Sequence, residues 1–476
     1  MPEINHDFVT WPWQYWATER GDDIALRLGG DQQQANMTWS QVSHHIDLYA
    51  QSLLAQGVKR DQLVAVIAPN SEQTLWMLLA IWRVGARYVG LNPKLTKAEV
   101  STQLAQLQHD FIWSVDYDIT GLSGQTLTLE LGQTQQMIPV MWQAHRAVTL
   151  TLTSGSTGTP KAAVHSPESH LANASGLLAR FGYSAADTWL LSLPLFHISG
   201  MAIIWRWLSQ GACLAINDKQ PLNEALDSVT HASLVPTQLQ RYLDYLSQNQ
   251  RTAQLKRVLL GGAIIPVTLT QQATSLGIEC WCGYGMTEMG STVTAKLADD
   301  SAGVGQVLPN RELFLRDGEI LVKGKALCLG YYRNKTIFPV VGNNELEPEW
   351  FATKDLGIWH NDELFIQGRV DNMFISGGEN VQPEDIEKVL LAHSSVHQAF
   401  ILPIADDEFG QRPVAILVTS HALDDGLVAQ LQSYMAEHVT SFKRPIHYVA
   451  LPEIFMESGI KISRKQLADW VSHYSF

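Results

Sequence analysis

Apolar strands alternate with amphipathic helices through much of the chain, and this pattern constrains the fold more than any other feature. Residues 63–69 (LVAVIAP) and 86–93 (ARYVGLNP) have the composition of short buried strands, and a helical pattern precedes each of them. Strand–helix–strand order with apolar strands is typical of parallel pairing, with helices covering the faces of the sheet. The same pattern returns at residues 186–197, 212–218 and 255–266. We therefore expect a large α/β body.

The later part of the chain has a different pattern. From about residue 302 it is punctuated by glycine and rich in strand-forming residues, which predicts a smaller β subdomain. A helix begins at Pro383, where acidic residues follow the proline, and the last hundred residues repeat strand and helix in a small α+β pattern. Because 476 residues exceed one compact core, we expect two or three domains. We predict the last boundary at residues 369–371.

Charge and hydropathy argue against two classes of partner. The formal net charge is −14 and no run of Lys or Arg is present, so the chain is not expected to bind nucleic acid. The most apolar window, residues 74–82, runs into Arg83 and is far shorter than the roughly 20 residues of a membrane span. Residues 1–20 lack the basic segment and apolar core of a secretory signal. We expect a cytoplasmic protein without membrane insertion, and self-association into a homo-oligomer stays open.

The cysteines do not point to a disulfide framework or a metal site. Cys280 and Cys282 flank a single tryptophan, and one such pair without a second pair is weak evidence for zinc. Cys213 and Cys328 lie far from them in the sequence. We expect small buried thiols in a reducing compartment.

Residues 153–161 (TSGSTGTPK) form the most distinctive motif. A loop of Gly, Ser and Thr presents backbone N–H groups and hydroxyls to phosphate oxygens, because glycine permits the required backbone angles. The motif is not a Walker loop, since Gly155 and Gly158 are three residues apart and Thr159-Pro160 separate Gly158 from Lys161. Composition alone leaves a flexible connection and a phosphate-binding loop equally open.

The order of residues in TSGSTGTPK resembles the phosphate-binding signature of the acyl-adenylate-forming superfamily, which includes acyl-CoA ligases, the adenylation domains of peptide synthetases, and luciferases. Companion motifs follow in the family's order. They are LPLFHISG (193–200), YGMTE (284–288), TKDLG (353–357), GRVDNMFISGGENVQPEDIE (368–387) and GIKISRKQL (459–467). The resemblance spans nearly the whole chain. It implies an α/β fold with an ATP- and acyl-binding N-terminal domain, residues 1–369, and a small mobile C-terminal α+β domain, residues 370–476.

The resemblance assigns roles in binding ATP and Mg²⁺. Tyr284 stacks on adenine, Thr287 contacts the α-phosphate, and Glu288 helps to hold Mg²⁺. Asp355 binds the ribose hydroxyls together with Arg369. Further nucleotide-binding candidates come from the phosphate loop and from glycine-rich segments beside the adenine and acyl pockets: Thr153, Ser154, Gly155, Ser156, Thr157, Gly158, Lys161, Gly261, Gly262, Ala263 and Gly285.

The remaining roles concern catalysis and domain movement. His197 lies near the acyl site and the α-phosphate. Lys461 is the catalytic cation, although Ile460 separates Gly459 from it where most members of the family have Gly-Lys. The small domain rotates about Asp371 and brings the segment that contains Gly377 and Gly378 against the thiol's tunnel.

Taken singly, each motif also has a plainer explanation. Tyr284-Gly285 is typical of a turn, Asp355 of a turn carboxylate, and His197 of a core histidine. Lys461 by itself would be a solvent-facing lysine in a basic tail. The functional interpretation rests on their joint occurrence.

The chemistry implied has two steps. A substrate carboxylate attacks the α-phosphorus of Mg·ATP, which gives an acyl-adenylate and pyrophosphate, and a thiol then displaces AMP. The protein must position two anions in line and stabilise the developing charge. Since only 15 residues follow Lys461, we expect free coenzyme A as the acceptor and no fused carrier domain.

Arg206 bears on the identity of the acid. It lies between two tryptophans, nine residues after His197, where a snorkelling arginine and a carboxylate-binding arginine are both plausible. The stretch FHISG…WRWL resembles the 2-succinylbenzoate–CoA ligases of menaquinone biosynthesis. That resemblance implies that Arg206 faces the non-reacting carboxylate of 2-succinylbenzoate. Another aryl- or medium-chain acid–CoA ligase is the alternative. A non-catalytic nucleotide-binding regulator would require loss of Lys461 or Glu288, and both are present.

Overall fold

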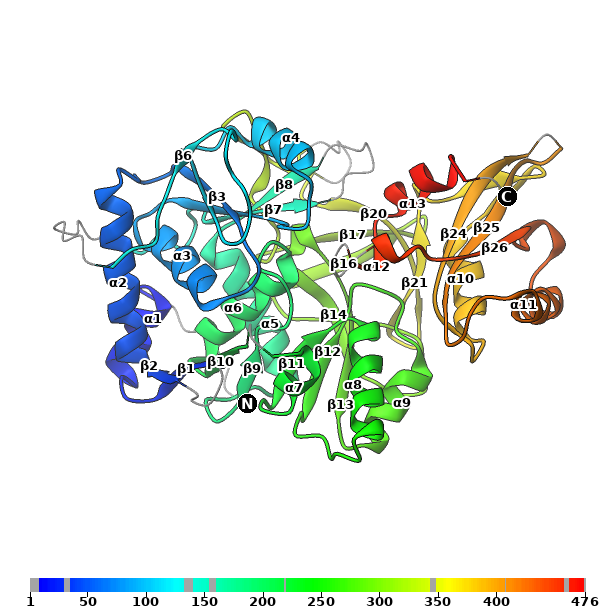
Figure 1. The fold of residues 1–476 in the computed structure, drawn as a ribbon, viewed down its shortest axis with the longest axis horizontal. Helices are drawn as coiled ribbons and strands as arrows, with labels where there is room; N and C mark the ends of the chain where they lie inside the picture. The colour runs from blue at the N-terminus through cyan, green and yellow to red at the C-terminus, as the bar shows by residue number, and fades with distance from the viewer. Residues whose placement is uncertain are drawn as a thin grey trace.

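The computed structural model describes residues 8–29, 35–131, 140–153, 160–217, 220–342, 348–406, 408–457 and 462–474. Figure 1 shows a broad body, in blue to yellow-green, and a smaller C-terminal part in orange and red at one side of it. The two parts meet near the antiparallel strands β20 (Phe351–His360) and β21 (Glu363–Arg369). Among the described residues, no helix combines the length and hydropathy needed to cross a membrane.

An eight-stranded sheet carries the first of the predicted strand–helix–strand units. Its central strands β3, β4, β5 and β7 pair in parallel, and β8 joins β7 in antiparallel orientation. In sheet order the strands are β19 (Thr336–Phe338), β18 (Gly330–Arg333), β8 (Lys161–His165), β7 (Thr149–Thr153), β4 (Arg87–Leu91), β3 (Leu63–Ile67), β5 (Phe111–Ser114) and β6 (Gln125–Thr126). The strands expected within 63–69 and 86–93 are confirmed as β3 and β4.

A nine-stranded sheet contains the strands expected within 186–197, 212–218 and 255–266. These are β9, β10 and β12. The neighbouring strands β1, β10, β9, β11, β12 and β13 pair in parallel, in that order across the sheet. In sheet order the strands are β15 (Gln306–Val307), β14 (Ser291–Leu297), β13 (Glu279–Met286), β12 (Arg257–Leu260), β11 (His231–Leu234), β9 (Thr188–Leu190), β10 (Cys213–Ile216), β1 (Ile24–Leu28) and β2 (Ala35–Thr38).

Helices pack between and around these sheets. They are α1 (Pro12–Glu19), α2 (Trp39–Ala55), α3 (Glu72–Arg83), α4 (Lys97–Leu107), α5 (Pro167–Phe181), α6 (Ile198–Gln210), α7 (Leu222–Leu226), α8 (Pro236–Gln248) and α9 (Val267–Ser275). Thr38 and Thr96 begin α2 and α4 with capping boxes, which satisfy backbone N–H groups at these helix starts.

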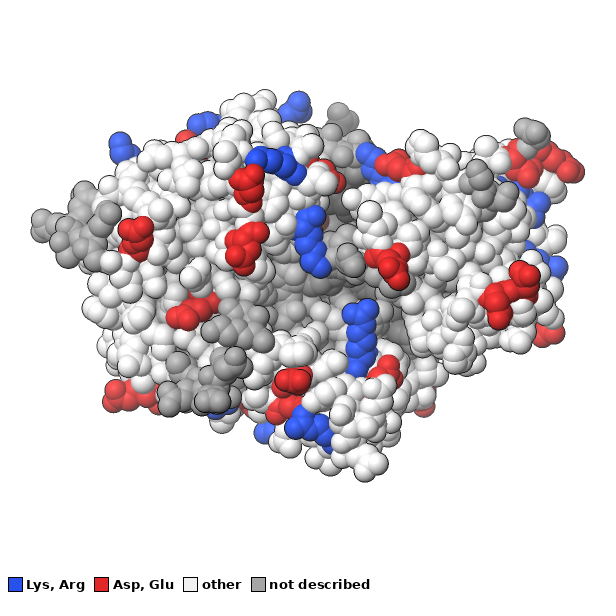
Figure 2. Space-filling view, in the orientation of Figure 1, with Lys and Arg blue, Asp and Glu red and all other residues white. Residues whose placement is uncertain are grey.

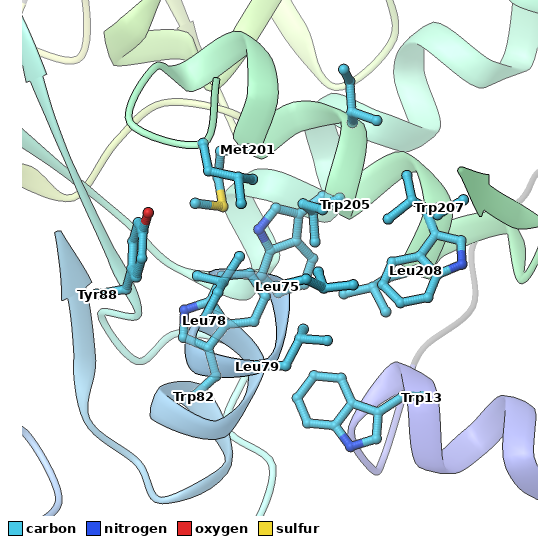
Figure 3. Packing of buried hydrophobic residues seen from close by; sticks show 14 of the residues in the cluster. Trp13, Leu75, Leu78, Leu79, Trp82, Tyr88, Met201, Trp205, Trp207 and Leu208 are labelled. Atoms are coloured by element: carbon cyan, nitrogen blue, oxygen red, sulfur yellow. The ribbon is translucent and has the colours of Figure 1, made fainter. Parts of the chain in front are cut away.

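The largest core is rich in tryptophan. Trp82 of α3 lies 4.9 Å from Trp205 of α6 between ring centroids, and Trp207 stacks on Trp39 at 5.0 Å. Figure 3 shows Trp82 and Trp205 close together among leucines of the two helices. Helix α6 is buried on nearly all sides, so the side chain of Arg206, which it carries, is held inside the protein by close packing.

The predicted β subdomain is confirmed in part. Strands β16 (Arg311–Arg316), β17 (Glu319–Gly324), β20 and β21 form an antiparallel four-stranded sheet of their own. However, β15 belongs to the nine-stranded sheet, and β18 and β19 belong to the eight-stranded one. The segment therefore connects three sheets.

The C-terminal part has the expected α+β composition. Its elements are β22 (Phe374–Ser376), β23 (Glu379–Val381), α10 (Pro383–Leu391), β24 (Val396–Asp406), β25 (Gly410–Thr419), α11 (Asp425–His438), β26 (His447–Ala450), α12 (Glu453–Glu457) and α13 (Arg464–Val471), with a short 3-10 turn at Ser441–Lys443. Helices α10 and α11 contribute to one core with β24 and β25, while α13 packs into a second cluster. The helix predicted to begin at Pro383 is confirmed.

Candidate active site

Four predicted site residues form one chain of hydrogen bonds at the junction of the two parts. Tyr284, from β13, donates its hydroxyl to Oδ2 of Asp355 on β20 at 2.5 Å. Arg369, at the end of β21, donates to Oδ1 of Asp355 at 2.6 Å and through Nε to Asp371 at 2.9 Å. The ribose and adenine candidates are thereby linked directly to the predicted hinge.

The electrostatics of this chain follow from burial and charge. Burial raises the pKa of Tyr284 well above its ordinary value, and the Asp355 carboxylate raises it further, so the phenol remains a donor. Burial opposes ionisation of Asp371, but the hydrogen bonds and charge of Arg369 outweigh it and lower the pKa of this carboxyl. Asp355 itself is 8% exposed. A buried carboxylate is a strong acceptor for paired hydroxyls such as those of a ribose.

A second group of candidates surrounds the phosphate loop. Thr153 ends β7 and Lys161 begins β8, and the two residues pair across the strands. Thr287 and Glu288 lie in a 3-10 turn, Thr287–Met289, directly after β13. Ser154, Gly155, Ser156, Thr157 and Gly158 lie outside the described residues, as does Lys461, so their placement stays a prediction.

Glu288 is buried and fixed by a neighbour that the sequence did not indicate. Its Oε1 accepts a 2.7 Å hydrogen bond from the hydroxyl of Tyr331 on β18. The described residues contain no group of three or more His, Cys, Asp or Glu suited to holding a metal. Mg²⁺ is usually held by one or two carboxylates together with substrate phosphates. The single buried carboxylate of Glu288 is compatible with that mode of binding.

Arg206 does not reach the surface. The residue is 1% exposed, and its guanidinium projects from α6 and donates to Ser233 Oγ at 3.3 Å and Thr292 Oγ1 at 3.4 Å. It also lies 5.2 Å from the ring centroid of Trp189. Among the described residues, no carboxylate forms an ion pair with it. The snorkelling interpretation is therefore wrong.

Burial lowers the pKa of Arg206 to about 9, and the nearby cationic Arg311 contributes in the same direction. Both effects express the cost of keeping this cation out of water without an anion. An anionic ligand at the guanidinium would offset that cost, so the electrostatics of this position favour a carboxylate.

The other candidates occupy loops and helix ends. His197 is the N-cap of α6 and lies directly before the helix that carries Arg206. Gly261, Gly262 and Ala263 follow the carboxyl end of β12. Gly285 cannot be replaced without movement, because a Cβ there would lie 2.1 Å from the carbonyl oxygen of Ser291.

Gly377 and Gly378 form the turn between β22 and β23 in the C-terminal part. Both have positive φ, +60° and +85°, which favours glycine. No hydrogen bond described here joins them to Asp355 or Glu288. Two groups of candidates are joined by hydrogen bonds within each group, one around Asp355 and one around Glu288.

Charged side chains, both acidic and basic, are spread over the face of the molecule drawn in Figure 2. Lys or Arg side chains border a hollow near its middle. Local cations of this kind attract an anionic substrate even on a protein of net charge −14.

Ser233, Thr292 and Tyr331 were missed in the sequence. Ser233 and Thr292 touch Arg206 from strands β11 and β14, and Tyr331 touches Glu288 from β18. Each lies 27 or more residues from its partner, so no local spacing reveals the contact. The sequence signal for Tyr331 was limited to a Gly-Tyr-Tyr run in a strand-rich segment.

Comparison with known families defines the class of protein. The profile of the family described as "AMP-binding enzyme" matches residues 13–332, and "AMP-binding enzyme C-terminal domain" matches residues 385–457. The chain belongs to the AMP-binding enzyme family. The resemblance to acyl-adenylate-forming enzymes is confirmed, as is the fold of a large N-terminal and a small C-terminal domain.

Individual relatives are more specific. The chain is 42% identical over 464 residues to a 2-succinylbenzoate–CoA ligase of Salmonella typhimurium, and the match covers 98% of each protein. It is 42% identical, with a TM-score of 0.90, to a substituted form of E. coli MenE with bound OSB-AMS, covering 98% of this chain and 99% of the other. A Bacillus subtilis o-succinylbenzoate coenzyme A synthetase, in complex with ATP and magnesium ion, matches at 26% identity and a TM-score of 0.80, covering 93% and 96%.

Proposed function

We propose that the chain ligates 2-succinylbenzoate to coenzyme A, using ATP and releasing AMP and pyrophosphate, as a step of menaquinone biosynthesis. The observation that carries this proposal is the buried guanidinium of Arg206, which has no carboxylate partner among the described residues. The whole-length similarity to 2-succinylbenzoate–CoA ligases supports the same substrate.

In the first step, the residues around Asp355 bind the nucleoside. Asp355 accepts from the two ribose hydroxyls, and Arg369 keeps that carboxylate oriented from its other side. Tyr284 presents its ring to the adenine. The glycine-rich turn at Gly261, Gly262 and Ala263 borders the adenine and acyl pockets. These contacts would place the α-phosphorus at a fixed position in front of the acyl carboxylate.

The phosphates lie between the loop at 153–161 and the turn at 287–288. Thr153, Lys161 and the intervening loop bind the β- and γ-phosphates, which leave as pyrophosphate. Thr287 donates to the α-phosphate. Mg²⁺, which Glu288 would hold, offsets the negative charge that gathers on the phosphate oxygens.

The acid substrate is held at both ends. Arg206, supported by Ser233 and Thr292, binds the carboxylate that does not react, while the reacting carboxylate points toward Thr287 and His197. Lys461 supplies the cation that brings this carboxylate and the α-phosphate together. A monocarboxylic acid would leave the Arg206 guanidinium unpaired. A site with an unpaired buried charge should bind that acid much more weakly than 2-succinylbenzoate.

In the second step, the thiol of coenzyme A attacks the acyl carbonyl and AMP leaves. We propose that the chain divides at residues 369 and 370, and that rotation at Asp371 exchanges Lys461 for the turn at Gly377 and Gly378. The partners proposed are small molecules only. We place the reaction in the cytoplasm, where ATP and coenzyme A are both available.

Separate assays of the two steps test this assignment. Lys461→Ala should reduce pyrophosphate release with 2-succinylbenzoate by about 100-fold or more, because general positioning and electrostatic effects of this kind contribute several kcal/mol. Formation of the thioester from supplied acyl-adenylate should change little. Equal losses in both steps would contradict the role of Lys461. Preference for another acid would contradict the substrate assignment instead.

A further inference from the structure

We propose that Tyr331 is the positioning residue for the metal-binding carboxylate, and that its phenol orients Glu288 toward Mg²⁺ while its ring supports Lys161. The inference rests on the proposed role of Glu288, which is assigned by resemblance. Tyr331 lies on β18, 43 residues after Glu288, and none of the motifs assigned to nucleotide binding includes it.

The backbone of Tyr331 is held from two sides. Strand β18 pairs with β8, with Tyr331 opposite Ala163, and it pairs with β19 on its other edge. Just before the strand, Leu329 N donates to Val164 O at 2.8 Å. Gly330 has no room for a side chain, because a Cβ would meet the carbonyl oxygen of Phe338 at 2.3 Å. The backbone that carries the Tyr331 phenol is therefore fixed by pairing on both edges of β18.

Two hydrogen bonds join this segment to Glu288. Cys328 N donates to the backbone oxygen of Glu288 at 2.7 Å, and the Tyr331 hydroxyl donates to Oε1 at 2.7 Å. The first fixes the position of the turn, and the second fixes the rotation of the carboxylate. Because the phenol engages Oε1, we assign the other oxygen, Oε2, to the cation.

The phenol is a neutral donor. An ionised carboxylate only accepts hydrogen bonds, so the Tyr331 hydroxyl supplies the proton of its contact to Glu288. A neutral donor of this kind orients a ligand carboxylate without cancelling its charge. Partners that orient metal ligands in this way typically alter metal affinity or activity by about 10- to 100-fold when they are removed.

The ring of Tyr331 contacts a second candidate residue, Lys161. The Lys161 ammonium lies 5.0 Å from the ring centroid, within the range of a cation–π contact. Lys161 is exposed at the start of β8, where it leaves the phosphate loop. One side chain thus contacts both the lysine assigned to the phosphates and the carboxylate assigned to their metal.

The neighbouring tyrosine provides a matched control. Tyr332 is in the same strand, but its side chain packs into the core formed by β3, β4, β5 and α4, and its hydroxyl faces Arg87 rather than the site. Tyr331→Phe and Tyr332→Phe therefore remove the same atom from adjacent positions. Only the first removes a contact to Glu288.

The test is equilibrium binding of Mn²⁺, followed by the electron paramagnetic resonance signal of the free ion, to enzyme saturated with α,β-methylene-ATP. Tyr331→Phe should weaken Mn²⁺ binding by about 10-fold. Affinity for the metal-free nucleotide in EDTA should stay within about 2-fold, because the ring beneath Lys161 is retained. Tyr331→Leu should weaken both, and Tyr332→Phe neither.

Three results would overturn the proposal. Mn²⁺ binding by Tyr331→Phe equal to that of the wild type would remove the orienting role of the phenol. An equal loss of Mn²⁺ and of metal-free nucleotide would indicate general disruption of the site. Unchanged Mn²⁺ binding in Glu288→Gln would remove the premise, and with it the metal role of Glu288 in the proposed function. The substrate assignment would be untouched by all three.

Discussion

At the level of single residues, Arg206 is a buried cation that is expected to lower stability in the absence of an anion. Its guanidinium is buried beside Ser233, Thr292 and Trp189, with no anion in the described structure to offset its charge. Arg311 is also buried, but it donates to the backbone oxygens of Pro309, Thr292, Ala172 and Asn173. The two arginines therefore differ: Arg311 is satisfied by four backbone oxygens, whereas the proposed role of Arg206 is to bind the anionic end of the substrate.

Arg206→Met should separate activity from stability. Loss of a charge-assisted contact of about 1.5–3 kcal/mol should lower kcat/KM for 2-succinylbenzoate by about 10- to 100-fold. Thermal unfolding should be unchanged or shifted upward, because an uncompensated buried charge is removed. Arg311→Met is the control and should lower the Tm, since it leaves buried carbonyls without donors. A large drop in Tm for Arg206→Met would show that the arginine is structural.

The sequence identified Arg206 as a candidate but did not indicate the residues that contact it, Ser233 and Thr292. Arg206 drew attention because a charged side chain stood in an apolar helix between two tryptophans. Ser233 and Thr292, which hold it, lie 27 and 86 residues away and belong to separate strands. Contacts of that kind depend on the order of strands in the nine-stranded sheet, which hydrophobic periodicity does not specify.

At the scale of secondary-structure elements, the ion pair between α10 and α13 determines how the end of the chain attaches. Arg464, the first residue of α13, donates to both oxygens of Glu387 on α10, and to Ile401 O on β24 at 2.9 Å. Glu387 is 3% exposed and also accepts from Ile401 N at 2.7 Å. Burial raises the pKa of Glu387 above its ordinary 4.5, against the opposing charge of Arg464.

Arg464→Met should destabilise the C-terminal part by about 3–5 kcal/mol, because it leaves a buried carboxylate unpaired. In this variant the pKa of folded Glu387 would rise further above its unfolded value. The folded state would then bind more protons than the unfolded state, so its stability should fall as pH rises above about 4.5.

Thermal unfolding of Arg464→Met and wild type at pH 5 and pH 8 checks this. We expect a larger difference between the two proteins at pH 8. The double variant Arg464→Met/Glu387→Met should recover much of the loss at both values. A deficit that is independent of pH and persists in the double variant would assign the effect to packing instead of charge.

The elements themselves were predicted well where they are local and poorly where they join distant segments. Strands β3, β4, β9, β10 and β12 follow directly from apolar runs bounded by turns. In contrast, β18 and β19 fall in the predicted β subdomain, but β18 pairs with β8, more than 160 residues earlier, and β19 pairs with β18. The strand propensity of a segment predicts that it will form a strand. Which strand it pairs with depends on packing across the whole N-terminal body.

At the scale of the whole molecule, the nucleotide site and the predicted hinge are continuous. Tyr284, Asp355, Arg369 and Asp371 are joined by successive hydrogen bonds from β13 to the first residues of the C-terminal part. Arg369 also donates to the second oxygen of Asp371 at 3.3 Å. If the chain rotates at Asp371, the proposed hinge, the hydrogen bonds between Asp371 and Arg369 must rearrange, and Arg369 is the residue that donates to Asp355.

Asp371→Pro should impair the conversion between the two steps, because proline fixes φ near −65° and removes the backbone N–H. The overall rate should fall by about 10-fold or more. At least one single step, measured separately, should remain closer to normal. Asp371→Ala removes the contact to Arg369 but keeps backbone freedom, and it should have a smaller effect. Unchanged rates of both steps and of the overall reaction in Asp371→Pro would contradict the hinge.

The proposed function requires an acid with two carboxylates, one that reacts and one that Arg206 binds. The most direct measurement is coenzyme A-dependent AMP release across a panel of acids at equal concentration, comprising 2-succinylbenzoate, benzoate, a medium-chain and a long-chain fatty acid. The buried, anion-seeking Arg206 predicts that kcat/KM for 2-succinylbenzoate exceeds that of each monocarboxylic acid by about 100-fold or more. Equal or higher kcat/KM for benzoate or a fatty acid would contradict the account.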